Sequence, residues 1–349
     1  MNQPRKLPRS ALGSLALIAA VVGGGAAAFA CTAGWFSPHR LTPGKMVEAF
    51  TPPNEAPLGH RRNHAKGICF TGVFEANGNG EQLSGARVFV PGRYPVVGRF
   101  NLGTPHSDTP DGTARVRGLG LLISSDDGHE WRTAMINPPV FPVSTPQAFY
   151  DMLRAGKDPS AVKAFTDSNP EIAAFLEWAK TAPWTASYAE ERYNSLNSFI
   201  FTDGAGEDHA VRWSLVPAAQ PAPVSKADLE KRGPNSLEQE ITERVRTAGP
   251  QRWTMVVTVA DPGDPTADPR KAWPSDRRTV PVGTLVVQRI EPERDGPCRD
   301  INFDPTVLPP GMRVSDDPFP AARSSVYRKS YDLRTAEAKY YPHTEAAKP

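Results

Sequence analysis

Prolines interrupt this chain at short intervals. The sequence of 349 residues contains 37 prolines, mostly scattered between short apolar runs. Proline cannot donate to a sheet ladder and breaks a helix interior, so it belongs at strand ends and in loops. The pattern therefore predicts many short strands joined by ordered loops and disfavours a helical bundle. Hydrophobic residues make up 39% of the chain, enough to bury a sizeable core.

The apolar runs and the spacing between them predict the order of the elements. Strands rich in Val, Ile, Phe and Leu are expected at Gly67–Ala76, Ala86–Val90, Val96–Leu102, Gly118–Ser124, Asn197–Phe201, Ala210–Leu215, Trp253–Val259 and Val280–Ile290. Helices are expected around Lys45–Phe50, at Pro146–Arg154 with Thr145 as N-cap, as two short helices within Asp158–Thr181, at Ser236–Thr247 and at Ala322–Lys339. This order predicts an α+β fold dominated by an antiparallel sheet, closed into a barrel with helices packed outside.

The N-terminus has the layout of an export segment. Residues 1–10 carry Arg5, Lys6 and Arg9 but no acid, and an apolar run follows from Ala11 to Ala30. This run approaches the roughly 20 residues that span a bilayer. The preceding positive charge places the N-terminus in the cytoplasm and the remainder outside. Ala28-Phe29-Ala30 fits a small-x-small cleavage rule, so residues 1–32 form either a cleaved signal or a membrane anchor.

Charge and cysteine content exclude several classes of function. The formal net charge is +2 and no block of like charge stands out, so no nucleic-acid partner is expected. The cysteines are Cys31, Cys69 and Cys298, an odd number without metal-type spacing. No disulfide framework can be read from them, and a structural zinc site is not expected. Cys31 raises a lipoprotein interpretation, although Ala28 is a poor start for a lipid-attachment box.

Three short motifs carry residue types suited to chemistry. His64 follows two arginines at the head of a strand, where it would accept a proton near anionic groups. Arg99 is a lone charge in an apolar strand. Arg323 and Tyr327 are four residues apart and share one helix face, where a guanidinium favours a phenolate able to ligate ferric iron. Taken singly, each has an ordinary alternative: a structural or exposed histidine, a surface arginine at a strand end, and a tyrosine packed on an arginine.

In combination, these motifs resemble the haem catalases. Arg61 to Gly67 resembles the distal Arg-x-x-His-Ala-Lys-Gly motif, and Asp304 to Tyr327 resembles the proximal motif. Further matches fall between them in the family order, at Val97–Asn101, Arg117-Gly118, Asn137–Phe141, Trp273-Pro274 and Pro281–Gly283. The resemblance covers most of the chain and implies a catalase-like antiparallel β-barrel with flanking helices, with haem b buried between the barrel and the C-terminal helix.

The resemblance also implies a role for each site residue. Tyr327 would be the proximal iron ligand, as in catalases, with Arg323 keeping it a phenolate. His64 would be the distal acid and base, and Asn101 takes the place of the family's serine that bonds it. Phe149 would lie over the haem. Three arginines would pair with the haem propionates, for which bidentate guanidiniums are well suited: Arg61, Arg99 and Arg334.

In two departures from typical catalases the chain resembles the catalase-related peroxidases. Ile136 stands where catalases carry the asparagine that orients hydrogen peroxide, and Asn137 matches a second, non-catalytic asparagine. The chain also ends 22 residues beyond Tyr327, where typical catalases continue with a further helical domain. An apolar Ile136 cannot orient hydrogen peroxide but suits an organic hydroperoxide.

The resemblance therefore implies a haem peroxidase over residues 33–349. It would reduce organic hydroperoxides, and hydrogen peroxide poorly, through a ferryl intermediate with an unknown electron donor. One alternative is a fatty-acid hydroperoxide isomerase or dehydratase of the allene-oxide-synthase type, and another is a haem-binding protein without turnover. The export segment predicts a periplasmic or inner-membrane-anchored enzyme with its catalytic domain outside the cytoplasm, and a homodimer is possible.

Overall fold

The computed structural model describes residues 9–32, 34, 37, 40–51, 57–156 and 158–340. It divides into two units, Met1–Thr42 and Pro43–Pro349. In the first unit, helix α1 (Arg9–Thr32) contains the stretch Gly13–Thr32, whose 20 residues have a mean hydropathy of 2.0. By length and composition this helix can cross a membrane, and a signal sequence would pass the same test. Arg5 and Lys6, on which the predicted orientation depends, lie outside the described residues.

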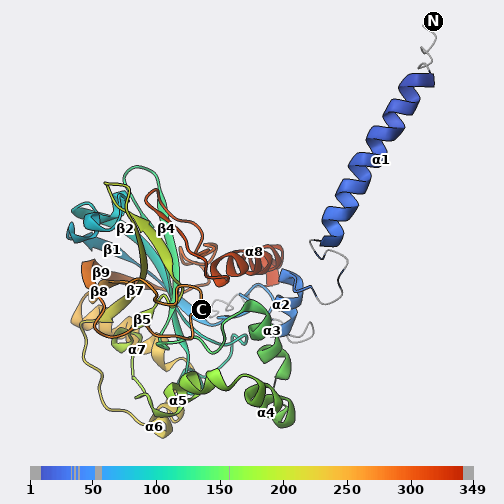
Figure 1. Ribbon diagram of the computed structural model, residues 1–349. Coiled ribbons are helices and arrows are strands. Elements are labelled where there is room, and N and C mark those ends of the chain that lie inside the picture. The colour runs from blue at the N-terminus through green and yellow to red at the C-terminus, as the bar shows by residue number, and fades with distance from the viewer. Residues whose placement is uncertain are drawn as a thin grey trace, which may run out of the picture. The chain divides into compact units, whose positions relative to one another are not determined.

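The second unit is built on an antiparallel sheet (Figure 1). Its strands are β1 (Gly67–Ala76), β2 (Gly92–Leu102), β3 (Arg117–Ser124), β4 (Glu130–Ile136), β5 (Tyr193–Asn194), β6 (Phe199–Thr202), β7 (Asp208–Pro217), β8 (Gln251–Val259), β9 (Thr279–Glu291) and β10 (Met312–Val314). The pairing order β7-β5-β4-β3-β2-β1-β9-β8 closes on itself because β8 also pairs with β7. The predicted closed barrel is confirmed, and β6 and β10 extend its wall.

Helices cover the outside of the barrel. They are α2 (Pro43–Phe50), α3 (Pro146–Ala155), α4 (Pro159–Ser168), α5 (Ala173–Thr181), α6 (Lys226–Glu230), α7 (Ser236–Ala248) and α8 (Phe319–Ala336). Helix α2 packs against both α3 and α8, so these three helices lie on one side of the barrel (Figure 1). The predicted N-cap of α3 is confirmed, because the Thr145 side chain accepts a hydrogen bond from the backbone N–H of Ala148.

The barrel interior is filled by side chains. On β2, the alternate residues Val96, Phe100 and Leu102 point inward and are almost fully buried. They join large aromatic residues from other strands, including Trp131 and Trp253. Because the interior is packed, a ligand cavity has to lie outside the wall, where the intervening residues of β2, β3 and β4 point.

Two local predictions were wrong. Ala86–Val90 is not a strand; residues Arg87–Phe89 form a short 3₁₀ turn that packs Phe89 against Trp131 and Phe201. Strand β4 was missed, because Glu130 and Arg132 dilute its apolar run. Only pairing with β3 shows that Trp131, Thr133 and Met135 face inward while the charged residues face out.

Candidate active site

One cavity collects all the site residues expected from the sequence. It lies on the outer face of β2, β3 and β4, beneath helices α2, α3 and α8. Its lining includes Arg61, His64, Arg99, Phe149, Arg323, Tyr327 and Arg334. These residues come from segments more than 250 positions apart, so only the closed barrel and the C-terminal helix bring them together. Their roles stay predictions; their proximity is a structural result.

Two neighbouring positions on the cavity wall carry small residues. Gly120 of β3 and Ala134 of β4 are cross-strand partners and both line the cavity. A Cβ atom at Gly120 would come within 2.8 Å of the Phe303 ring, so this position requires glycine. Small side chains along the wall leave room for a planar ligand between the barrel and α8.

The backbone at His64 is strained. Its φ of 55° lies in the left-handed region, and Leu196, which also lines the cavity, has a φ of 59°. Among the described residues these are the only non-glycine positions with positive φ. Such conformations cost about 1–3 kcal/mol and persist where surrounding contacts enforce them, often at functional sites. Here a guanidinium N–H of Arg99 donates to the His64 carbonyl oxygen at 2.9 Å.

The His64 imidazole is neutral at ordinary pH. Burial, reinforced by the positive charge of Arg99, lowers its pKa to about 4, although the nearby Asn101 side chain acts in the opposite direction. No hydrogen bond of ordinary geometry joins the two side chains, and Nδ1 of His64 and Oδ1 of Asn101 both lack a partner within the described residues. A neutral ring with an unpaired nitrogen beside a cavity is ready to accept a proton.

This lowered pKa predicts a loss of stability in mild acid. The unfolded chain binds a proton at His64 near pH 6.5, whereas the folded chain does so only near pH 4. The stabilisation is therefore complete above pH 6.5 and is lost as pH falls toward 4. At about 1.4 kcal/mol per pKa unit, the loss is about 3 kcal/mol. Urea unfolding at pH 7 and pH 4 measures it. The difference should shrink in His64→Asn and persist in the exposed-site control His129→Asn.

Tyr327 and Arg323 meet on one face of α8, as their spacing predicts. Two N–H groups of Arg323 donate to the Tyr327 hydroxyl oxygen, at 3.0 and 3.3 Å. Arg323 is held in turn by the carbonyl oxygen of Ala134 at 2.9 Å and by Oδ1 of Asn197 at 2.6 Å. Nδ2 of Asn197 then donates to the Asp317 carboxylate at 2.9 Å.

Asn197 was not predicted from the sequence to be a site residue. It stands at the start of the segment Asn197–Phe201, which was expected to be a strand, and nothing local marks it as functional. In the structure β6 begins only at Phe199, which leaves Asn197 to reach Arg323. Burial raises the pKa of Asp317 despite its hydrogen bonds. A chain of hydrogen bonds therefore runs from Asp317 to the Tyr327 oxygen.

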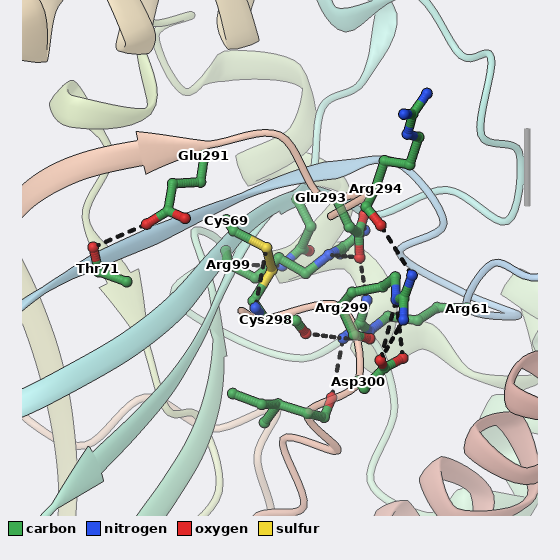
Figure 2. Close-up of a disulfide and its surroundings, with 12 residues drawn as sticks. Arg61, Cys69, Thr71, Arg99, Glu291, Glu293, Arg294, Cys298, Arg299 and Asp300 are labelled. Carbon is green, nitrogen blue, oxygen red and sulfur yellow. Dashed lines mark hydrogen bonds and ion pairs between the residues drawn. A yellow bond between two sulfur atoms is a disulfide. The ribbon is translucent and has the colours of Figure 1, made fainter. Parts of the chain in front are cut away.

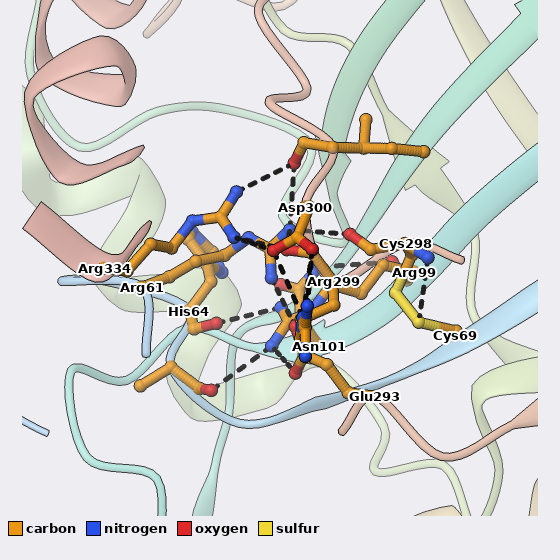
Figure 3. Close-up of polar contacts among 12 residues, drawn as sticks. Arg61, His64, Cys69, Arg99, Asn101, Glu293, Cys298, Arg299, Asp300 and Arg334 are labelled. Atoms are coloured by element: carbon orange, nitrogen blue, oxygen red, sulfur yellow. Dashed lines mark hydrogen bonds and ion pairs between the residues drawn. A yellow bond between two sulfur atoms is a disulfide. The ribbon is translucent and has the colours of Figure 1, made fainter. Parts of the chain in front are cut away.

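Three arginines that line the cavity, Arg61, Arg99 and Arg334, lie close together (Figure 3). Arg99 forms a bidentate ion pair with Glu293 at 2.7 and 2.6 Å, and Arg61 binds the same carboxylate. Arg334 donates to the backbone carbonyl oxygens of Arg299 and Ile301. Burial alone would raise the pKa of Glu293, but the charges of Arg99 and Arg61 outweigh burial and lower it, so the carboxylate stays ionised.

Glu293 is a second residue that sequence reasoning missed. It lies in the polar run Glu291–Asp295, which looks like an ordinary solvated loop. In the structure it is 7% exposed and partners two of the three arginines assigned to a ligand. Three guanidiniums and one carboxylate leave a local charge of +2. The more exposed Asp300 approaches Arg334 at 3.8 Å from the rim.

An apolar wall completes the cavity. The Phe149 ring lies 5.7 Å from Phe50 and 5.1 Å from Phe141, whose ring is 4.9 Å from Phe319. Ile136 also lines the cavity, whereas Oδ1 of Asn137 accepts a hydrogen bond from the backbone N–H of Arg117 at 2.9 Å. Asn137 is thus committed to the backbone, and the position next to it offers only a hydrocarbon side chain.

A buried disulfide lies behind the arginines. Cys69 of β1 is bonded to Cys298, which is 229 residues further along the chain (Figure 2). The sequence alone did not reveal this pairing, because three cysteines allow three pairings and no spacing favours one. Cys31 is the free cysteine.

A packed antiparallel barrel whose outer wall carries a buried histidine, an arginine cluster and a tyrosine–arginine pair defines a catalase-like protein. The family model described as catalase matches residues 29–341. The chain belongs to the catalase family.

Its relatives include short members of that family. A catalase-related peroxidase from Synechococcus elongatus is 36% identical over 333 residues, covering 92% of this chain and 95% of the relative. A catalase-related peroxidase from Mycolicibacterium paratuberculosis is 31% identical over 300 residues, covering 84% of this chain and 95% of the relative. Among solved structures, catalase A from Saccharomyces cerevisiae has a TM-score of 0.70 at 19% identity. That match covers 79% of this chain and 61% of the yeast chain, so this chain spans under two thirds of its length.

Proposed function

We propose that this protein reduces organic hydroperoxides, in preference to hydrogen peroxide, with electrons from a separate donor. As a member of the catalase family it is a haem peroxidase, an oxidoreductase. The observation that carries the proposal is that one cavity holds a neutral imidazole, an arginine-bound tyrosine and a cluster of three arginines.

These residues fit haem. The Tyr327 oxygen would bind the iron, and the Arg323 guanidinium, which donates to that oxygen, would hold it in place. The arginine cluster would hold the two carboxylates through charge-assisted hydrogen bonds. The Phe149 ring would lie against the flat group, and Gly120 and Ala134 would leave it room. When bound, haem would supply the redox chemistry that no protein side chain here provides.

The protein itself would move the proton. His64 is neutral above about pH 4, so it can take the hydroperoxide O–H proton. The same ring would return this proton to the leaving oxygen as the O–O bond breaks. Overall, one hydroperoxide, two electrons and two protons give one alcohol and one water. General acid–base catalysis of this kind contributes about 10²- to 10⁴-fold to rate.

The cavity wall supports an organic substrate. A hydrogen peroxide molecule has to be oriented by hydrogen bonds, yet Ile136 offers none and Asn137 is occupied by the backbone. The cluster of Phe50, Phe141 and Phe149 instead offers apolar surface to an alkyl group. Specificity would come from burying that group.

Ile136→Asn should shift this specificity. A carboxamide adds a hydrogen bond to hydrogen peroxide and loses apolar contact with an alkyl group. Because one hydrogen bond contributes about 1 kcal/mol, kcat/KM for hydrogen peroxide should rise about fivefold, and kcat/KM for cumene hydroperoxide should fall by a similar factor. Ile136→Leu, which stays apolar, is the control. An unchanged ratio in Ile136→Asn would contradict the assignment of Ile136 to specificity.

The first unit supports a site of action outside the cytoplasm. We propose that residues 1–32 are a signal or inner-membrane anchor and that residues 33–349 form the haem peroxidase domain. Helix α1 has suitable length and hydropathy, and the disulfide Cys69–Cys298 suits an oxidising compartment, because disulfides persist there and are rare in the cytosol.

Reconstitution tests the proposal. The full chain is loaded with haem, its absorption spectrum is recorded, and cumene hydroperoxide is added with a reducing dye. A ferric tyrosinate-type spectrum and dye oxidation are expected. Product formation without dye oxidation would instead identify a hydroperoxide isomerase, and haem uptake without any turnover would identify a haem-binding protein. Failure to take up haem would refute the proposal.

A further inference from the structure

The arginine cluster is held by an irregular segment. We call residues Glu293–Ile301 the arginine-binding segment. It follows β9, which ends at Glu291, and it contains no strand or helix. Nη2 of Arg61 donates to the carbonyl oxygens of Cys298 and Ile301 at 3.1 and 3.0 Å. Arg334 donates to carbonyl oxygens of the same segment, and Glu293 binds Arg99 (Figure 3). All three arginines therefore depend on it.

No sheet ladder fixes this segment, but the disulfide does. Cys69 is the cross-strand partner of Arg99, so the bridge begins directly opposite one of the three arginines. It ends at Cys298, whose own carbonyl oxygen accepts from Arg61 and whose N–H donates to Sγ of Cys69 at 3.2 Å. Both cysteines are fully buried, in a small apolar cluster with Leu122 and Phe303.

The segment passes so close to the bridge that its position is sharply defined. A Cβ atom at Gly296 would lie 2.7 Å from Sγ of Cys69 and 2.5 Å from the carbonyl oxygen of Pro292. Contacts this short cannot occur, so glycine is required and the backbone here has no alternative path while the disulfide is intact.

We propose that Cys69 and Cys298 are positioning residues for haem binding: their disulfide holds the arginine-binding segment so that Arg61, Arg99 and Arg334 face the haem carboxylates. This inference rests on the proposed function. It assigns the bridge a role at the ligand beyond general stabilisation of the fold. The arginines would remain in the chain without it, but the carbonyl oxygens and the Glu293 carboxylate that orient them would not stay in place.

Haem dimethyl ester distinguishes a loss of arginine positioning from a loss of folding. Its two carboxylates are esterified, so its binding does not depend on ion pairs with the arginines. Affinities for haem and for the ester are measured with wild type, Cys69→Ala/Cys298→Ala and the control Cys31→Ala. Loss of oriented charge pairing should weaken haem binding by the double variant about tenfold or more. Ester affinity should change by less than about threefold, so the two losses are not parallel. The bound fraction should keep its tyrosinate-type spectrum, and Cys31→Ala should match wild type.

Two results would overturn the inference: equal haem affinity in the double variant and wild type, or a parallel loss for haem and its ester. If the wild type binds haem and the double variant shows either result, only this inference is refuted. If the wild type itself does not bind haem, the proposed function is refuted as well. If the double variant does not fold, Gly296→Ala replaces it. This substitution keeps both cysteines but displaces the segment, and the same selective loss of haem affinity is expected.

Discussion

Tyr327→Phe should weaken haem binding by at least about a hundredfold. The variant keeps the ring and its packing on α8 but removes the oxygen to which Arg323 donates two hydrogen bonds. Even the groups that hydrogen-bond to a metal ligand typically contribute about 10- to 100-fold to metal affinity, so loss of the ligand atom itself should cost at least as much. Any haem that still binds should lack the tyrosinate-type spectrum. Titration of the unloaded protein with haem, followed by absorption, measures both effects.

Tyr331→Phe is the matched control. Tyr331 is on the same helix and its ring packs against the Arg334 guanidinium at 4.8 Å, a contact that phenylalanine retains. Its spectrum and affinity should equal those of wild type. If Tyr327→Phe bound haem as tightly as the control and with the same spectrum, Tyr327 would not be the iron ligand.

His64→Asn should lower kcat/KM for organic hydroperoxides by about 10²- to 10⁴-fold while haem affinity stays close to that of wild type. His64 contributes a proton acceptor, whereas the predicted haem contacts come from Tyr327 and the arginines. Asparagine is chosen because it tolerates the left-handed backbone found at this position, where φ is 55°. Steady-state kinetics with a reducing dye, and a haem titration in parallel, separate turnover from binding.

The exposed His129→Asn should match wild type in both measurements. Activity of the wild type should persist down to about pH 4–5, because the pKa of His64 is lowered to about 4 and the ring stays unprotonated above it. An acid limb near pH 6.5, or turnover of His64→Asn at the wild-type rate, would show that His64 is not the proton acceptor.

The hydrogen-bond chain at Tyr327 and the ion-pair cluster around Glu293 both orient arginine side chains, by different interactions. At Tyr327, the hydrogen bonds that Arg323 donates to Oδ1 of Asn197 and to the Ala134 carbonyl oxygen fix the direction of its guanidinium. In the cluster, a carboxylate with lowered pKa keeps two guanidiniums together that would otherwise repel each other. Both arrangements orient charge before a ligand arrives, which reduces the free energy spent on ordering during binding.

Local patterns were sufficient for most elements. A run rich in Ile, Phe and Val marked β1, whose observed bounds Gly67–Ala76 equal the predicted ones, and Thr145-Pro146 marked the start of α3. The four-residue spacing of Arg323 and Tyr327 predicted their contact because both lie on one helix. Strand β4 and the 3₁₀ turn at Arg87–Phe89 could not be found this way, since their conformations depend on partners elsewhere in the barrel.

The order of the apolar runs was sufficient to predict the barrel class, because strand and helix patterns are local properties. The seven candidate site residues came from the resemblance of short motifs to those of the catalases. The groups that surround those residues became visible only in the folded chain. Glu293, Asn197 and the Cys69–Cys298 bridge act across 100 or more positions of sequence. Nothing in the residues around them indicates their partners, because the distances that matter arise only when the barrel closes and α8 packs against its wall.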